Sequence, residues 1–209
     1  MSLWRRRPSK RPLKQTILIV GEGQETEPNY FYGLKREDAV RRSFTVTVKP
    51  GRGFTALDVV QWTVKKMKGA AQEGKRFDEA WCCIDVEEQG KDRKIPEARK
   101  LAEQNGIKIA WSNPSFERWF LSHFERSCGF LKDCDAVIAQ LDKHWQPKFH
   151  LPYNKNDQEV YTRLRPFSEV AIENARWALE EHFLAKDIVD DGCNSATEVY
   201  RLVSHLLGA

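Results

Sequence analysis

A chain of 209 residues, 41% hydrophobic and 31% charged, is long enough to bury the core of one globular domain. No segment approaches the ~18 uninterrupted apolar residues of a membrane span, and the basic start is not followed by the apolar stretch of a secretory signal. We therefore expect a cytoplasmic protein with no membrane association. The five cysteines include no CxxC pair, which indicates reduced thiols rather than a disulfide framework.

The formal net charge of +4 is concentrated at one end of the chain. Residues 1–14 contain six basic residues and no acid, so the remaining residues are net acidic. The six are Arg5, Arg6, Arg7, Lys10, Arg11 and Lys14. We predict a flexible basic arm over residues 1–14, which either binds the phosphates of a nucleic acid or is simply solvated.

The predicted elements of the first half alternate between strand and helix. Residues 16–21 predict a β-branched first strand, Pro28 suits the first turn of a helix that ends near Arg41, and residues 43–50 alternate as a second strand. A helix at 55–72, a strand at 79–85, a helix at 96–106 and a strand at 107–113 follow. This order predicts an α/β core over about residues 15–125, with a mostly parallel sheet covered by helices on both faces.

The second half is predicted to be helical. Helix-like segments lie at 114–124, 131–145, 167–183 and 195–208, and residues 146–157 are too rich in Pro, Asn and Lys for regular structure. We expect this helical part, about residues 126–209, to pack on the sheet. The prediction is a single domain over residues 15–209.

Acidic residues follow two of the predicted strands directly. The first strand ends at Gly21 and leads into Glu22 and Glu27, and the third ends at Asp85 and leads into Glu87. Because the carboxyl ends of parallel strands open into one crevice, we expect the two acidic segments to face each other. Asp85 and Glu87 are two residues apart, which in an extended chain points both side chains the same way.

Carboxylates gathered at one sheet edge repel each other unless a cation neutralises them. Oxygen ligands of this kind select Mg²⁺ or Mn²⁺, and the alternative is that the glutamates are exposed loop charge. Gly21 and Gly23 permit a tight turn and a close backbone approach there. The phosphate-binding pattern GxxxxGK[ST] is missing, so any ATP hydrolysis would belong to a partner.

The exit of the fourth strand adds further candidate residues. Ser112 or Asn113 is predicted to cap the helix that Pro114 begins. Glu117, in the first turn of that helix, either answers the helix dipole or reaches the acidic cluster as a further metal ligand. His123 lies on another face of the helix and is predicted to be a packed histidine.

Two polar segments of the second half have a structural and a functional interpretation. Lys155 is either a solvated loop lysine or a contact for phosphate or carboxylate. Asn194 or Ser195 is predicted to begin the last helix, with Glu198 completing a capping box with Ser195. The alternative is that Asn194, Lys155 and Tyr153 line a substrate cleft.

Four segments together resemble a known family. GEGQETEPNYFYGLK, WCCIDVEEQG, SNPSFERWFLSHF and NSATEVYRLV, in this order, are similar to the RloB-like family of bacterial and phage-defence-associated proteins. The core of that family is similar to the Toprim fold of nucleotidyl-transfer and hydrolysis enzymes. The resemblance thus implies a Toprim-like, Rossmannoid α/β fold, and it spans nearly the whole chain.

The resemblance also implies roles for individual residues. Glu22 matches the Toprim glutamate that acts in proton transfer, and Asp85 with Glu87 matches the magnesium-binding aspartate pair, with Glu87 as a longer replacement for the second aspartate. Glu27 resembles the additional acid of overcoming-lysogenization-defect nucleases, and Lys155 lies in a recurrent YNK segment. The implied function is metal-dependent hydrolysis of nucleic-acid phosphodiesters in phage defence or a restriction-linked system, beside a partner ATPase. The alternative is a non-catalytic module that binds nucleic acid or a partner protein.

Overall fold

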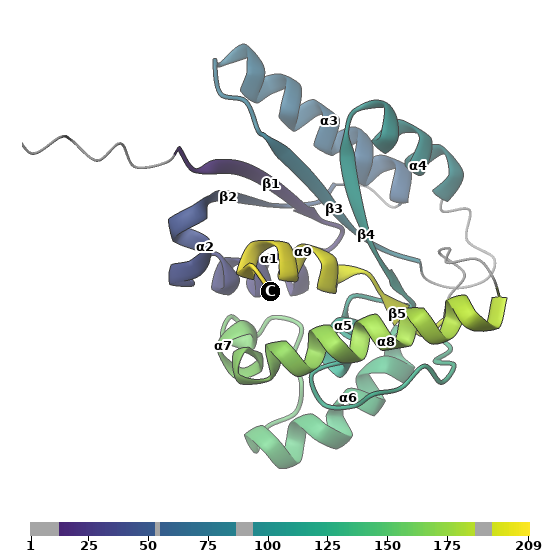
Figure 1. The fold of residues 1–209 in the computed structure, drawn as a ribbon. Coiled ribbons are helices and arrows are strands. Elements are labelled where there is room, and N and C mark those ends of the chain that lie inside the picture. The colour runs from purple at the N-terminus through teal and green to yellow at the C-terminus, as the bar shows by residue number, and fades with distance from the viewer. Residues whose placement is uncertain (1–12, 53–54, 87–93, 187–193) are drawn as a thin grey trace, which may run out of the picture.

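The computed structural model describes residues 13–52, 55–86, 94–186 and 194–209. Its centre is a five-stranded sheet in the order β2-β1-β3-β4-β5 (Figure 1). The strands are β1 (Gln15–Gly21), β2 (Phe44–Pro50), β3 (Glu79–Asp85), β4 (Ile107–Asn113) and β5 (Ala196–Thr197). The first four are parallel and β5 is antiparallel to β4. The predicted α/β class with a mostly parallel sheet is confirmed.

Strands β1 and β3 are mostly apolar because helices cover both faces of the sheet. In β1, Ile17 and Ile19 face one hydrophobic core, and Leu18 and Val20 face the other. This period of two is the geometry of an extended strand. In register, Gly21 pairs with Cys83, so β1 and β3 end at the same edge.

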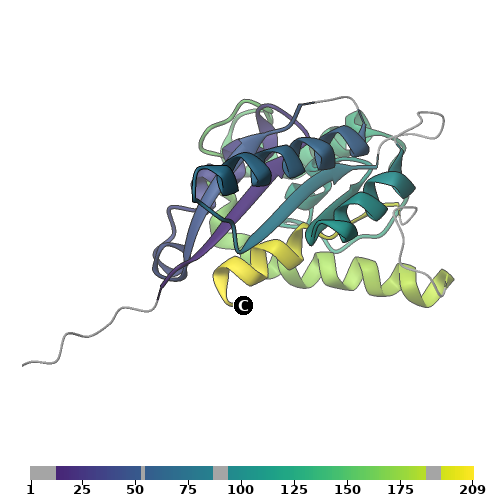
Figure 2. The same cartoon turned by 90° about the horizontal axis from the view of Figure 1, so that it is seen from above.

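Helices form a layer on each face of the sheet (Figures 1 and 2). Helices α3 (Ala56–Gln72) and α4 (Ile95–Gln104) cover one face. The other layer contains α1 (Thr26–Leu34), α2 (Asp38–Ser43), α5 (Glu117–Leu121), α6 (Cys134–Phe149), α7 (Val160–Leu164), α8 (Ser168–Lys186) and α9 (Val199–Leu207), with a short 3₁₀ turn, η1 (Arg165–Phe167). The helical second half therefore packs on the sheet as predicted.

Several predicted boundaries are wrong in the details. The helix predicted from Pro28 to Arg41 is two helices, because the chain turns after Leu34 so that both Leu34 and Val40 are fully buried. The helix predicted over 114–124 is regular only over the five residues of α5. Helix α6 continues through Pro147, inside the predicted loop, and ends at Phe149; the next residue, His150, caps it with a positive φ of 59°.

The last predicted helix, 195–208, is also wrong at its start. Residues Ala196 and Thr197 form β5, and the backbone N–H of Glu198 donates to the Trp111 carbonyl (2.7 Å) before α9 begins at Val199. The pairing completes the edge of the sheet beside β4. Helix α7 has no counterpart among the predicted elements. Among the residues with described structure, no helix is long and apolar enough to cross a membrane.

Candidate functional site

The carboxyl ends of β1 and β3 meet directly. Glu22 follows the last residue of β1, and Asp85 is the last residue of β3. The backbone N–H of Asp85 donates to Glu22 Oε2 at 3.2 Å, although the two residues are 63 positions apart. The two acidic strand ends therefore face each other, as the order of the elements predicted.

A cavity of about 250 Å³ opens beside these strand ends. It contains five of the predicted site residues, namely Glu22, Glu27, Asp85, Glu117 and Lys155, together with Gly23. Its remaining lining residues are Gln24, Glu25, Thr26, Phe116 and Asn156. Glu87, the other predicted ligand, lies outside the described residues.

Glu27 is held against the turn that follows β1. Its side chain is 3% exposed, and Oε1 accepts a hydrogen bond from the Gly23 backbone N–H at 2.8 Å. A Cβ at Gly21 would lie 2.7 Å from Glu27 Cβ, and one at Gly23 would lie 2.6 Å from Glu27 Oε2. Glycine is thus needed at both positions for the carboxylate to approach the backbone so closely.

The surroundings of Glu27 favour its protonated form. Burial raises the pKa of this carboxyl to about 7, and the neighbouring Glu117 and Glu22 carboxylates add to the increase. The hydrogen bond from Gly23 lowers the pKa and offsets only part of it. Glu27 is therefore suited to accept and release a proton near neutral pH.

Glu117 is a buried residue of the cavity lining, and several hydrogen-bond donors surround its carboxylate. It is 2% exposed and accepts hydrogen bonds from Ser115 Oγ (2.8 Å), Tyr153 Oη (3.2 Å) and the Cys134 thiol (3.5 Å). Lys155 Nζ lies 3.6 Å from Glu117 Oε1. These donors stabilise the buried charge, since an unpaired carboxylate here would be costly.

Lys155 places a positive charge at the opening of the cavity. Its side chain is 52% exposed, and its Nζ lies 3.2 Å from Cys134 Sγ. Partial burial lowers the pKa of Lys155, but its interactions with Glu117 and Cys134 together outweigh this and raise the pKa above its ordinary value. The ammonium group therefore stays charged, with part of it directed to solvent.

The predicted caps at the end of β4 are wrong. The N-cap residue of α5 is Phe116, which makes no side-chain capping bond. Instead, Ser112 Oγ pairs with Thr197 Oγ1 (2.8 Å), and Asn113 Oδ1 accepts from Asn194 Nδ2 (3.1 Å). Asn194 also bonds both the N–H and the carbonyl of Leu131 (2.9 and 2.7 Å). Since these partners come from distant segments, the side chains serve tertiary contacts rather than helix ends.

The predicted capping box at the last helix is wrong for a similar reason. Ser195 Oγ accepts from Arg118 Nε at 2.7 Å, and Glu198 Oε1 pairs with Arg201 at 3.0 Å. Arg118 is fully buried, and it also donates to Ser122 Oγ (2.9 Å) and to the Ser127 carbonyl. Burial lowers its pKa to about 10, so it remains charged at neutral pH.

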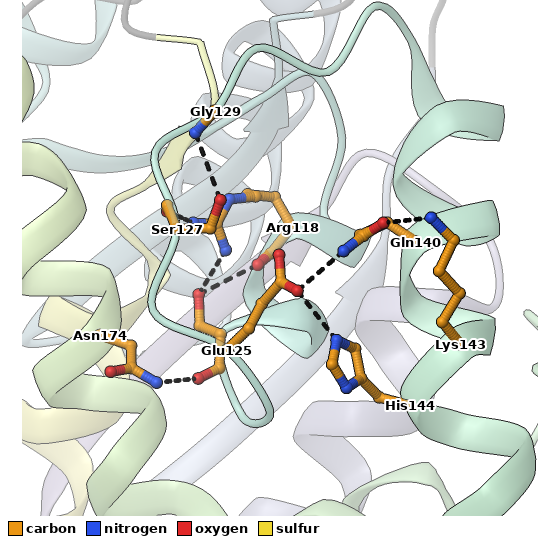
Figure 3. Close-up of polar contacts among 9 residues, drawn as sticks. Arg118, Glu125, Ser127, Gly129, Gln140, Lys143, His144 and Asn174 are labelled. Carbon is orange, nitrogen blue, oxygen red and sulfur yellow. Dashed lines mark hydrogen bonds and ion pairs between the residues drawn. The ribbon is translucent and has the colours of Figure 1, made fainter.

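Arg118 was missed by sequence reasoning, since an arginine in a predicted helix is normally solvated. Figure 3 shows its guanidinium beside Ser127, and nearby the Glu125 carboxylate between Gln140 and His144 of α6. Arg118 connects α5 to the loop that follows it, through Ser127, and to the segment before β5, through Ser195. It thus helps to fix the position of α5, the helix that begins with Glu117.

The aromatic residues around α5 belong to the core. Phe116, Trp119 and Phe120 are at most 1% exposed. His123 is buried, with Nδ1 3.0 Å from the Trp119 carbonyl, and burial lowers its pKa to about 4. The interpretation of His123 as a packed histidine is confirmed.

Only one of the six basic residues of the arm lies in the described structure. Lys14 is exposed just before β1. The other five predicted contacts, Arg5, Arg6, Arg7, Lys10 and Arg11, lie outside the described residues.

The donor set at the cavity is compatible with Mg²⁺ or Mn²⁺. In the part of the chain with described positions, which leaves out Glu87, no three His, Cys, Asp or Glu side chains are grouped as ligands of one ion. Magnesium commonly takes only one or two protein carboxylates and completes its shell with water and substrate phosphate. Glu22 and Asp85 both line the cavity and are joined by the hydrogen bond from the Asp85 backbone N–H to Glu22 Oε2, so they can supply the two carboxylates.

The fold and the site define an α/β protein with an acidic cavity at the carboxyl edge of its parallel sheet, the edge where sheets of this kind bind their ligands. The family model described as RloB-like protein matches residues 17–206, and the chain belongs to this family. No curated protein matches the sequence.

Proposed function

We propose that this protein hydrolyses nucleic-acid phosphodiesters with the help of Mg²⁺ or Mn²⁺, in the manner of Toprim-like nucleases. One observation carries the proposal: the acidic residues Glu22, Glu27 and Asp85 line a single cavity together with Lys155, whose side chain is 52% exposed. Acidic groups that bind metal and one cation that binds phosphate are the parts that phosphodiester hydrolysis requires.

In this proposal Glu22 and Asp85 hold the metal, and Glu87 adds a further carboxylate. The bound ion would supply Lewis-acid chemistry by polarising the phosphate and activating water. Without a cation, the carboxylates at this edge repel each other, which is one cause of the raised pKa of Glu27. The acidic cluster is therefore expected to gain stability when a divalent ion binds.

Glu27 and Lys155 have different roles. With a pKa of about 7, Glu27 accepts the proton of the attacking water and can return it to solvent. Lys155 contacts a non-bridging phosphate oxygen and helps offset charge on the leaving oxygen. Glu117 positions Lys155 through their ion pair, whose atoms lie 3.6 Å apart.

The proposed biological role is based on the resemblance to the RloB-like family. We propose that the enzyme acts in phage defence or a restriction-linked system, in the cytoplasm, alongside a partner ATPase. The sequence lacks the GxxxxGK[ST] loop, so energy from ATP would have to come from that partner.

The test is calorimetric titration of Mg²⁺ and Mn²⁺ into wild-type and Asp85→Asn protein, followed by cleavage assays on plasmid DNA, single-stranded DNA and RNA. The proposal expects wild-type binding, weaker binding by Asp85→Asn, and cleavage only by wild type. If neither ion binds, or if Asp85→Asn binds and cleaves normally, the protein is instead the non-catalytic binding module.

A further inference from the structure

Three basic side chains surround one indole ring on α3. The charged groups of Lys66, Arg52 and Lys65 lie 4.2, 5.0 and 5.7 Å from the ring centroid of Trp62. Arg52 and Lys65 are exposed, and Trp62 and Lys66 are partly exposed. We call these four residues the Trp62 surface.

Within the part of the chain that the structure describes, the basic side chains of the Trp62 surface have no ion-pair partner. Trp81 is different, because the Lys108 ammonium over its ring also lies 2.9 Å from Glu79 Oε2. The three like charges of the Trp62 surface repel each other, so an anion placed between them would be stabilised.

The Trp62 surface adjoins the acidic cavity through the backbone. Gly51, which precedes Arg52, packs so closely on the end of β1 that a Cβ there would lie 2.4 Å from the Gly21 carbonyl oxygen and 2.9 Å from that of Glu22. Gln24, a residue of the cavity wall, donates from Nε2 to the Gly51 carbonyl at 2.7 Å. Arg52 therefore directly follows a residue that contacts the wall of the cavity.

We infer that the Trp62 surface binds the phosphate backbone of the nucleic-acid strand whose scissile bond enters the cavity. The inference rests on the proposed function and identifies where its substrate is held. A cavity lined by glutamates and an aspartate repels a polyanion, so a strand needs a cationic surface beside it. Lysine and arginine contacts to phosphate position the strand without reading its sequence.

The geometry favours a strand of phosphates over an acidic protein segment. Arginine and lysine are gathered around a rigid ring, and cation–π contacts hold their charged groups in place on one exposed surface, where a chain of repeated negative charges can contact more than one of them. Binding would release the counterions condensed on the strand, so affinity should fall steeply with salt. Trp62 itself keeps the three cations together, as a positioning residue.

The experiment measures binding without catalysis. The full chain is titrated, in EDTA, into a 5′-fluorescein-labelled DNA strand of about 30 nucleotides and into its duplex, at salt concentrations from roughly 50 to 200 mM. Wild type is compared with the Lys65→Ala/Lys66→Ala double variant and with Trp62→Leu. The matched control is Lys143→Ala/Lys148→Ala, which removes two exposed lysines from α6 on the opposite face of the sheet. Circular dichroism checks that each variant is folded.

We expect the Lys65/Lys66 variant to bind about tenfold or more weakly at low salt, with a salt slope smaller by about 1.5 to 2, and the control to bind like wild type. Trp62→Leu should weaken binding with a smaller change of slope. Equal losses in the two double variants, or no loss in either, would overturn the inference. The binding assay contains no metal and is therefore independent of cleavage. A protein that binds DNA in this way but does not cleave nucleic acid in Mg²⁺ or Mn²⁺ would refute the proposed function and leave the inference about the Trp62 surface standing.

Discussion

The Glu22 carboxylate accepts a hydrogen bond from the Asp85 backbone N–H at 3.2 Å, and this contact joins the exits of β1 and β3. The contact exists because β1 and β3 are parallel neighbours in register, with Gly21 opposite Cys83. It also orients Glu22, since a carboxylate fixed by a backbone donor keeps one oxygen turned to that donor. The sheet topology thus brings together the two residues of this hydrogen bond at the candidate active site.

Glu22→Gln should abolish cleavage and leave the fold intact. The amide oxygen of the new side chain can still accept from the Asp85 N–H, but the negative charge that binds a divalent ion is lost. We expect at least about a 100-fold decrease in the rate of Mg²⁺-dependent cleavage. The control is Glu103→Gln, which changes an exposed glutamate of α4 outside the cavity lining. Similar losses in both variants would argue against a specific role for Glu22.

Introducing a methyl group at Gly21 should destabilise the protein. The new Cβ would lie 2.7 Å from Glu27 Cβ, and rotation of the Glu27 side chain cannot relieve a contact so near its backbone. We expect Gly21→Ala to lower the free energy of unfolding by about 1–3 kcal/mol, measured by urea denaturation. Gly69→Ala, with nothing within 4 Å of the new Cβ in α3, should instead raise it by about 0.5–1 kcal/mol.

The raised pKa of Glu27 makes stability depend on pH. The folded-state pKa is about 7 against an ordinary value of 4.5, so the folded protein binds a proton that the unfolded chain has released between these values. The contribution of the protonated group is fully present below pH 4.5 and is lost as the pH rises through about 7.

Glu27→Gln should remove this dependence, because the amide stays neutral at every pH. In EDTA, the variant is expected to match wild type near pH 4 and to exceed its free energy of unfolding at pH 8 by on the order of 3 kcal/mol. The measurement is urea denaturation of both proteins across this range. A constant difference from pH 4 to pH 8 would show that Glu27 is not a buried carboxyl of raised pKa.

Loss of Arg118 should be costly although it lies outside the cavity. Arg118→Met keeps much of the length of the side chain but leaves Ser195, Ser122 and the Ser127 carbonyl without their buried donor. We expect the free energy of unfolding to fall by about 2–4 kcal/mol. Arg41→Met, which removes a 68% exposed arginine paired with Asp38 at 4.0 Å, should change it by less than about 0.5 kcal/mol.

The sequence by itself determined the α/β core and the position of the acidic cluster. Strand 16–21 and strand 79–85 are readable because burial on both faces demands continuous apolar residues. Their parallel direction then follows from the alternating order of strands and helices between them, and parallel strands end at one edge. Glu22 and Asp85 were thus predictable as neighbours from local patterns and one topological rule.

Only the tertiary structure decided how the polar residues around that cluster are used. Asn194 and Ser195 have the local pattern of a helix cap, yet they bond Leu131 and Arg118, more than 60 positions away. The surface around Trp62 likewise forms only when the chain around Arg52 folds back beside α3. A hydrogen bond or a cation–π contact depends on distance in space, and periodicity along the chain carries no information about partners so remote in sequence.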